Sequence, residues 1–283
     1  MPRSPLGWLD LIVPKDAGSR RIAADLAYGA DPRHRLDLFA PKRTNGPLPL
    51  MIFVYGGGWH EGTREDYSFA GRAFAALGFL TAVIDYRLVP EVHFPAFVED
   101  CGRAASWLQA HAAAYGGDRH RVVLSGHSAG AYNAVTLALD PARFGASGLV
   151  GHIEAVVGLS GPFDFYPFDV RESRDAFANY PEPKQTQPVE MVTPAAPPML
   201  LVHGNTDTVV GLYNSVHLAE KLRNAGVPVE ERHYPKMGHP HTVLALMRPF
   251  RRIWPEYRDI AAFLDRRLTK GAAASETAAV RVT

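Results

Sequence analysis

The feature that most constrains the fold is a strand–turn–helix pattern built around one serine. Residues 121–134 read RVVLSGHSAGAYNA, which predicts a short apolar strand, a sharp Gly-His-Ser-Ala-Gly turn and an alanine-rich helix. Such a turn strains the backbone of its central residue, Ser128, and leaves the side chain exposed at the top of the sheet. Gly126 and Gly130 flank the turn because a Cβ at either position would collide with the neighbouring strand or helix. We interpret Ser128 as a nucleophile, since the strand and the helix around it argue against a chance G-x-S-x-G match.

Strands alternate with helices along the rest of the chain, which is typical of βαβ units. An antiparallel pair, 22–28 and 35–39, is expected at one edge of the sheet. The sequence therefore predicts an α/β protein with about eight mostly parallel strands and helices on both faces. A continuous apolar run predicts a buried strand at 48–54, and apolar residues at helical spacing predict a helix at 66–77. Further strands are expected at 79–84, 153–159, 199–203 and 229–234, and further helices at 94–115, 214–225 and 255–268.

Three segments depart from this alternation. Residues 160–198 are rich in proline and aromatic residues, and a loop of this length in a compact domain usually covers a site, so we expect a small lid. Residues 1–20 are expected to lie over the surface, anchored by the apolar residues 11–13. The Ala-, Ser- and Thr-rich tail 271–283 is expected to be disordered. The length of 283 residues fits one α/β unit, so we predict a single domain over 1–270.

A serine hydroxyl is a weak nucleophile, so Ser128 needs a base within hydrogen-bond reach and a carboxylate that orients the base. Catalytic groups of a parallel sheet lie at the carboxyl ends of its strands. Asp207 follows the predicted strand 199–203, and His239 follows the predicted strand 229–234. The order Ser128, Asp207, His239 is the order that accompanies this elbow in α/β-hydrolases. These three residues are the predicted catalytic triad.

The alternatives to this triad are weaker. His241 stands two positions after His239, but the loop position and the preceding glycine favour His239 as the base. Asp164 is the rival acid, yet it comes one strand too early in the chain. Four other polar residues are not assigned to the triad. His203 is interpreted as holding a turn, and Asp85 as capping a strand. His127 is interpreted as the variable position of the elbow, and Asp100 as a solvated helix position.

A glycine-rich loop, Tyr-Gly-Gly-Gly-Trp at 55–59, follows an apolar strand and precedes the elbow. Acyl transfer places negative charge on the former carbonyl oxygen, and the loss of one N–H donor to that oxygen costs about 3 kcal/mol. Glycines let the backbone approach a substrate closely. We assign the oxyanion donors to Gly57, Gly58 and Ala129, the residue after the nucleophile. A phosphate-binding loop is excluded, because neither Lys-Ser/Thr nor a G-x-G-x-x-G pattern is present.

Composition narrows the range of partners. Lysine and arginine total 30 against 29 acidic residues, with a net charge of +1 and no basic stripe, so no nucleic-acid partner is expected. One cysteine, Cys101, permits no intrachain disulfide. The first residues lack the apolar core of a signal peptide, and no apolar run approaches a membrane span. We expect a cytoplasmic protein without a membrane partner, and a homo-oligomer is compatible with the sequence.

Taken together, these motifs resemble the bacterial esterases and arylformamidases of the α/β-hydrolase superfamily, which are related to hormone-sensitive-lipase-like carboxylesterases. The resemblance covers residues 22–268 and departs from the usual pattern at two places. Tyr55 stands where the family usually has a structural histidine, and we expect a modest effect because tyrosine also forms hydrogen bonds. His127 stands where the hormone-sensitive-lipase branch has aspartate, which favours the formamidase-like branch. The resemblance depends on Gly56-Gly57-Gly58-Trp59, Asp85-Tyr86-Arg87, Gly126 to Gly130, His203-Gly204 with Asp207, and Gly238-His239.

The predicted activity is hydrolysis of carboxylic esters through an acyl-enzyme on Ser128, with no metal and no organic cofactor implied. Only the segment 160–198 is available as a lid, so we expect small-molecule substrates with short-chain acyl or aryl groups. Trp59, Phe163 and Phe165 are candidates to line an apolar substrate pocket, and packing in the core is the alternative for the same rings. Two other functions stay open: an amide hydrolase of N-formyl aromatic amines with the same triad, and a non-catalytic relative that binds a small ligand.

Overall fold

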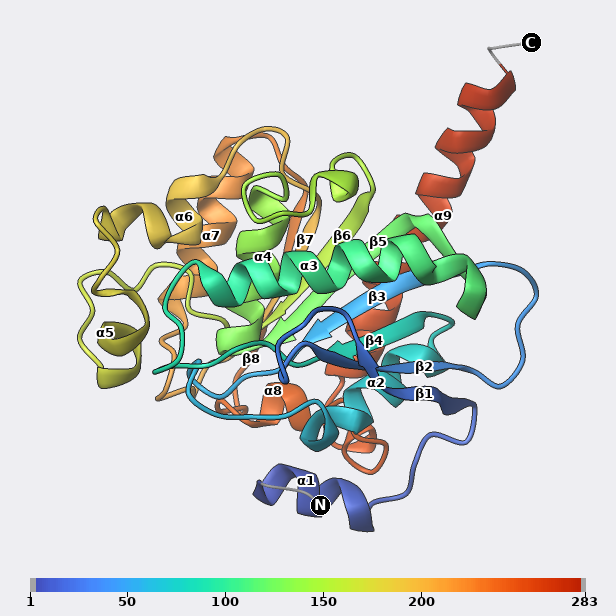
Figure 1. Ribbon diagram of the computed structural model, residues 1–283, viewed down its shortest axis with the longest axis horizontal. Helices are drawn as coiled ribbons and strands as arrows, with labels where there is room; N and C mark the ends of the chain where they lie inside the picture. Colours follow the sequence, from blue (N-terminus) through green and yellow to red (C-terminus); the bar gives the residue numbers. More distant parts are fainter. Residues whose placement is uncertain (1–3, 281–283) are drawn as a thin grey trace.

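The computed structural model describes the backbone of residues 4–280 and the side chains of residues 4–269. One sheet of eight strands forms the centre of this part of the chain, in the order β1-β2-β4-β3-β5-β6-β7-β8 (Figure 1). Strand β2 is antiparallel to β1 and β4, and all other neighbours are parallel, as the sequence predicted. The strands are β1 Ser19–Ala27, β2 Arg35–Pro41, β3 Leu48–Val54, β4 Leu80–Ile84, β5 Gly117–His127, β6 Ile153–Leu159, β7 Met199–Gly204 and β8 Val229–Tyr234.

Helices cover both faces of the sheet. Helices α2 (Ser68–Ala76) and α9 (Glu256–Val280) share one face, where the hydroxyl of Tyr257 donates to the carbonyl oxygen of Ala73 at 2.9 Å. Helices α3, α4 and α7 lie on the other face, and α3 crosses in front of the sheet in Figure 1. Their apolar sides bury the central strands, which explains why β3, β4 and β7 are almost wholly apolar. The bounds are α3 Ala96–His111, α4 Ala129–Leu139 and α7 Tyr213–Asn224.

The proline-rich segment 160–198 is not the structureless loop that its sequence suggested. It forms α5 (Arg171–Phe177), a 3-10 turn (Pro183–Thr186) and α6 (Pro188–Met191). These helices have four to seven residues, which is too short for apolar periodicity to reveal them. Figure 1 places α5 beyond the ends toward which the parallel strands point. The segment therefore lies where a lid would be expected to lie.

The two ends of the chain also differ from the predictions. Residues 5–12 form a helix, α1 (Pro5–Ile12), whose N-terminus is capped by the Ser4 hydroxyl accepting from the Gly7 amide at 3.1 Å. The predicted anchor 11–13 is wrong for Leu11 and Ile12, which are exposed. Val13 does pack on the core, together with Leu6 and Leu9 of α1. At the other end α9 continues to Val280 instead of giving way to a disordered tail at 271, consistent with the high helix propensity of alanine. The last three residues of that predicted tail lie outside the described residues.

A cluster of buried charges ties the antiparallel edge to the parallel sheet. Arg64, whose side chain is 10% exposed, contacts Asp37 of β2 through Nε at 3.0 Å and binds Asp85, which follows β4. The Arg64 amide also donates to Asp85 Oδ1 at 2.7 Å, so Asp85 has the structural role that the sequence suggested. Asp100 was expected to be solvated, but it is fully buried and accepts hydrogen bonds from Arg87 and His34. That expectation failed because its partners lie in distant loops.

Removal of one member of this cluster leaves a buried charge without compensation. We expect Arg64→Ala to lower the free energy of unfolding by about 3–5 kcal/mol. Arg223→Ala is the matched control, since Arg223 is half-exposed and its pairing with Glu231 is worth at most about 1 kcal/mol. Urea denaturation of both variants measures the difference, and equal losses of stability would contradict the structural role of Arg64.

Candidate active site

The turn between β5 and α4 has the strained geometry that the sequence predicted. Ser128 has φ 55° and ψ −125°, a conformation that L-residues rarely adopt, and its amide donates to the carbonyl oxygen of Leu159 at 2.8 Å. A Cβ on Gly126 would lie 2.3 Å from the carbonyl oxygen of Gly130. A Cβ on Gly130 would lie 2.1 Å from the carbonyl oxygen of Val54. Glycine is therefore required at 126 by the close approach of helix α4 and at 130 by the close approach of strand β3.

The structure brings the three predicted triad residues together from loops at three strand ends. His239 Nε2 lies 2.9 Å from Ser128 Oγ, and His239 Nδ1 lies 2.8 Å from Asp207 Oδ2. A neutral His239 with its proton on Nδ1 donates to Asp207 and accepts from the Ser128 hydroxyl. The histidine is thus held between an acceptor and a nucleophilic oxygen.

Asp207 is held as a carboxylate by the groups around it. Burial alone would raise the pKa of this carboxyl, but hydrogen bonds from His203, His239 and the Val210 amide outweigh burial and hold the pKa far below its usual range. The amides of Val209 and Val210 each donate to Oδ1 at 2.9 Å. Asp207 is therefore a carboxylate at ordinary pH.

His203 supports the acid as well as the turn. Its Nε2 donates to the carbonyl oxygen of Val210 at 2.9 Å and lies 3.4 Å from Asp207 Oδ2. Its Nδ1 accepts from the Ser215 hydroxyl at 2.7 Å, which fixes the proton on Nε2. The role of His203 in the turn was predicted from the sequence. Its contact with Ser215 was not, because Ser215 lies on helix α7.

The rival residues lie elsewhere. Asp164 pairs with His217 Nδ1 at 2.6 Å on the surface. His241 Nδ1 accepts from the Gly238 amide at 2.7 Å and its ring contacts Trp254. Both residues have partners of their own outside the Ser128–His239–Asp207 chain.

His127, the residue before Ser128, holds the loop that carries His239. His127 is 5% exposed, and its Nε2 donates to the carbonyl oxygen of His239 at 3.1 Å. Burial, together with the neighbouring His239 ring, lowers the pKa of His127 to about 3, so this histidine stays neutral at ordinary pH. From the sequence we interpreted this position as variable, because no residue near His127 in the chain indicates its contact with His239.

The glycine-rich loop lies beside the elbow. Gly57 has φ 129°, and a Cβ there would lie 2.1 Å from the carbonyl oxygen of Glu61, so only glycine fits. Among the described residues, no acceptor is paired with the amides of Gly57, Gly58 or Ala129. Ala129 is the first residue of α4, where amides point outward from the helix end.

Tyr55 anchors this loop to the core. It is fully buried, and its hydroxyl accepts from Arg33 Nη2 at 2.6 Å. Arg33 Nη2 also donates to the carbonyl oxygen of Gly62, and the Tyr55 ring stacks on Tyr86. Tyr55 therefore forms the hydrogen bond expected of it, and its partner is an arginine from the β1–β2 loop.

The predicted substrate-binding aromatics belong mainly to the core. Trp59 is 4% exposed, donates from Nε1 to Asn133 Oδ1 at 3.1 Å and stacks on Phe165. Phe163 is fully buried with its ring against Gly161, so its assignment to a substrate pocket is corrected to core packing. Phe165 is half-buried at the edge of the same aromatic cluster. The proline-rich composition did not distinguish these two roles.

The chain is similar in sequence to a known protein family. A profile of the BD-FAE family matches residues 36–222, about two thirds of the chain. The chain belongs to the BD-FAE family. The matched region contains the glycine-rich loop, the elbow and Asp207, and it ends before His239.

Curated relatives and solved structures extend this result. The chain is 31% identical over 257 residues to isoprenylcysteine alpha-carbonyl methylesterase ICME of Arabidopsis thaliana, covering 82% of this chain and 59% of the relative. It is 32% identical over 219 residues to esterase LipC of Mycobacterium tuberculosis, covering 69% and 54%. The chain thus spans little more than half the length of these relatives. Esterase B from Lactobacillus rhamnosis superposes with a TM-score of 0.82 at 19% identity, covering 96% of this chain and 92% of that one, which shows the α/β-hydrolase fold.

Two other kinds of site are absent from the residues that the structure describes. Within them, no helix has both the length and the apolar character needed to cross a bilayer. In the same part of the chain, no group of three or more His, Cys, Asp or Glu side chains is arranged to hold a metal ion.

The close approach of α4 to β3 makes the elbow sensitive to a single methyl group. We expect Gly130→Ala to lower the free energy of unfolding by about 1–3 kcal/mol, because its Cβ would overlap two carbonyl oxygens of the β3 end. Gly18→Ala is the control, since nothing lies within 4 Å of a Cβ at that position. Urea denaturation compares the two, and a Gly130→Ala protein as stable as the wild type would refute the steric argument.

Proposed function

We propose that this protein is a serine carboxylesterase that hydrolyses short-chain acyl or aryl esters through an acyl-enzyme. The observation that carries the proposal is the continuous contact from Ser128 Oγ through His239 to Asp207, at 2.9 Å and 2.8 Å. A strained serine, a singly protonated histidine and a buried carboxylate form the arrangement that activates a hydroxyl nucleophile. The esterase names of the related proteins support esters over N-formyl amines as substrates.

In the proposed mechanism, His239 Nε2 takes the proton of Ser128 as Oγ attacks the ester carbonyl. Asp207 keeps the other proton on Nδ1 and stabilises the imidazolium without being protonated. The amides of Gly57, Gly58 and Ala129 bind the oxyanion of the tetrahedral intermediate. His239 then protonates the leaving alcohol. In the second half of the cycle His239 takes a proton from water as the water attacks the acyl-enzyme, and returns it to Ser128 Oγ as the carboxylic acid leaves.

The surroundings of the site favour small substrates. In the segment 160–198, Phe165 and Phe177 pack on Trp59, and Phe168 packs on Phe165 and Phe177. Helix α5 approaches the oxyanion loop, where Glu172 Cγ lies 3.2 Å from the Cβ position of Gly58. Little room therefore remains on this side for a long acyl chain.

The nucleophile is tested by Ser128→Ala. We expect ester hydrolysis to fall by about 10³-fold or more, because the remaining groups have no oxygen to activate. A fluorophosphonate probe should label the wild-type protein and fail to label the variant. Ser106→Ala, on the outer side of α3, is the control and should retain both activity and labelling. Persistent turnover or labelling in Ser128→Ala would sink the assignment.

Substrate size is tested by a series of p-nitrophenyl esters. We expect kcat/KM to be highest for two- to four-carbon acyl groups and to fall for long chains, because α5 restricts the space beside Gly58. N-formylkynurenine, measured in parallel, tests the amide alternative. A maximum at long acyl chains, or faster turnover of the formamide, would contradict the proposed preference.

A further inference from the structure

A cavity of about 670 Å³ adjoins the oxyanion loop on the side away from the aromatic cluster. Gly56, Gly57 and His127 border it on the side of the elbow. None of Trp59, Phe163 and Phe165 lines it, so it is a different space from the predicted substrate pocket. Its apolar lining comes from α1, the loops after β3 and β4, and α8 (His241–Leu244), namely Leu6, Leu9, Tyr67, Leu88, Val243 and Leu244.

The cavity lies on the side of the base. Pro240, directly after His239, lines it together with Val243 and Leu244 of the short helix that follows. His127, which also lines it, donates to the carbonyl oxygen of His239. In acyl transfer the leaving oxygen must receive its proton from the catalytic imidazole, so the alcohol part of an ester lies next to the base. A group that occupies this cavity while its carbonyl meets Gly57 is therefore the alcohol part.

The chemistry of the walls favours an uncharged, apolar ligand. The guanidinium of Arg33, which borders the cavity, already donates to the Tyr55 hydroxyl and to the carbonyl oxygens of Gly62 and Tyr86. His127 is neutral at ordinary pH. The lining also includes polar residues, but most of its accessible surface is apolar; these polar residues are Ser4, His60, Glu61, Thr63 and Asp66. An apolar surface favours an apolar group by about 25 cal/mol for each Å² removed from water.

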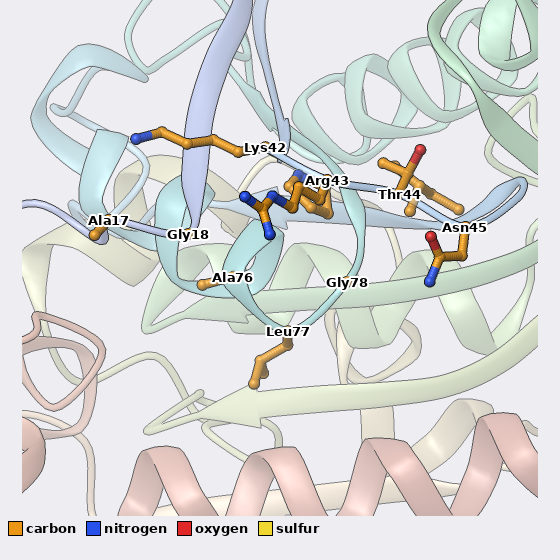
Figure 2. A pocket seen from close by; sticks show the side chains of 11 residues that line it. Ala17, Gly18, Lys42, Arg43, Thr44, Asn45, Ala76, Leu77 and Gly78 are labelled. Atoms are coloured by element: carbon orange, nitrogen blue, oxygen red, sulfur yellow. The ribbon is translucent and has the colours of Figure 1, made fainter.

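A second hollow of comparable volume lies at the opposite end of the sheet. It measures about 660 Å³ and is formed by the loop after β2 and the end of α2 (Figure 2). Exposed Lys42 and Arg43 border it, near the point where β3 begins. The triad lies at the other ends of the strands, so this hollow has no part in ester binding.

We propose that the cavity beneath α1 is the alcohol subsite, and that it accepts uncharged, apolar alcohols of branched or aromatic shape. The proposal rests on the esterase function proposed above. Helix α1 forms one wall of the subsite through Leu6 and Leu9, which makes the N-terminal segment a determinant of specificity. The same helix presents Trp8, Leu11 and Ile12 to solvent, so its two faces can be altered separately.

The test uses a matched pair of substitutions on the two faces of α1. Leu9→Trp fills the cavity, while Leu11→Trp adds the same side chain on the exposed face. For Leu9→Trp we expect kcat/KM for benzyl acetate to fall at least tenfold, with ethyl acetate and ethyl hexanoate changed less than twofold. Leu11→Trp should leave all three esters unchanged. Leu9→Ala, which enlarges the cavity, should shift the preference toward bulkier alcohols.

Each other outcome overturns the proposal. If Leu9→Trp slows ethyl hexanoate but not benzyl acetate, the cavity holds the acyl group. If Leu9→Trp and Leu9→Ala, both with wild-type unfolding midpoints, leave all three esters unchanged, the cavity is not a subsite. Failure of the underlying esterase function looks different, because the wild-type protein would then hydrolyse none of the esters and would not be labelled by the fluorophosphonate.

Discussion

The contact on which the rest of the structure depends is the approach of the first turn of α4 to the end of β3. The α carbon of Gly130 lies so close to the carbonyl oxygens of Val54 and Tyr55 that no side chain fits between them. This approach sets the position of Ser128 relative to the glycine-rich loop, because that loop begins where β3 ends. The nucleophile and the proposed oxyanion donors are thus fixed by one backbone contact.

Buried polar groups behind the site orient the histidines that surround it. Ser215 donates to His203, which sets the proton on Nε2 and directs it toward Val210 and Asp207. The carbonyl oxygen of His239 accepts from His127, whose ring burial keeps neutral. Because these partners are buried, the orientation of the base is determined before any substrate arrives.

Much of the fold could be predicted from the sequence because its signals are local. The segments that form β3, β6 and β8 have the predicted bounds, and the glycines of the elbow indicate a close backbone approach. The positions of Asp207 and His239 followed from the rule that functional groups lie at strand ends. The structure places His239 within hydrogen-bond distance of both Asp207 and Ser128.

What escaped prediction depends on contacts between distant segments. Asp100 lies on α3, in which polar and apolar residues are mixed. It is buried because the loops that carry His34 and Arg87 pack against it. The burial of Phe163 depends on Gly161 and the helix behind it, which composition does not reveal. The face that α1 turns to the core was misjudged because a helix of eight residues carries too short a pattern.

The lone cysteine gives the protein a practical property. Cys101 lies inside α3, its thiol donates to the carbonyl oxygen of Phe97 at 3.2 Å, and burial raises the pKa of the thiol well above its usual value. Since the thiolate is the reactive form, the folded protein offers no thiol to reagents in solution. A cysteine introduced on α1 or α5 would therefore be the single attachment point for a spin label or a dye. The two segments that flank the site can be followed spectroscopically without first removing any native residue.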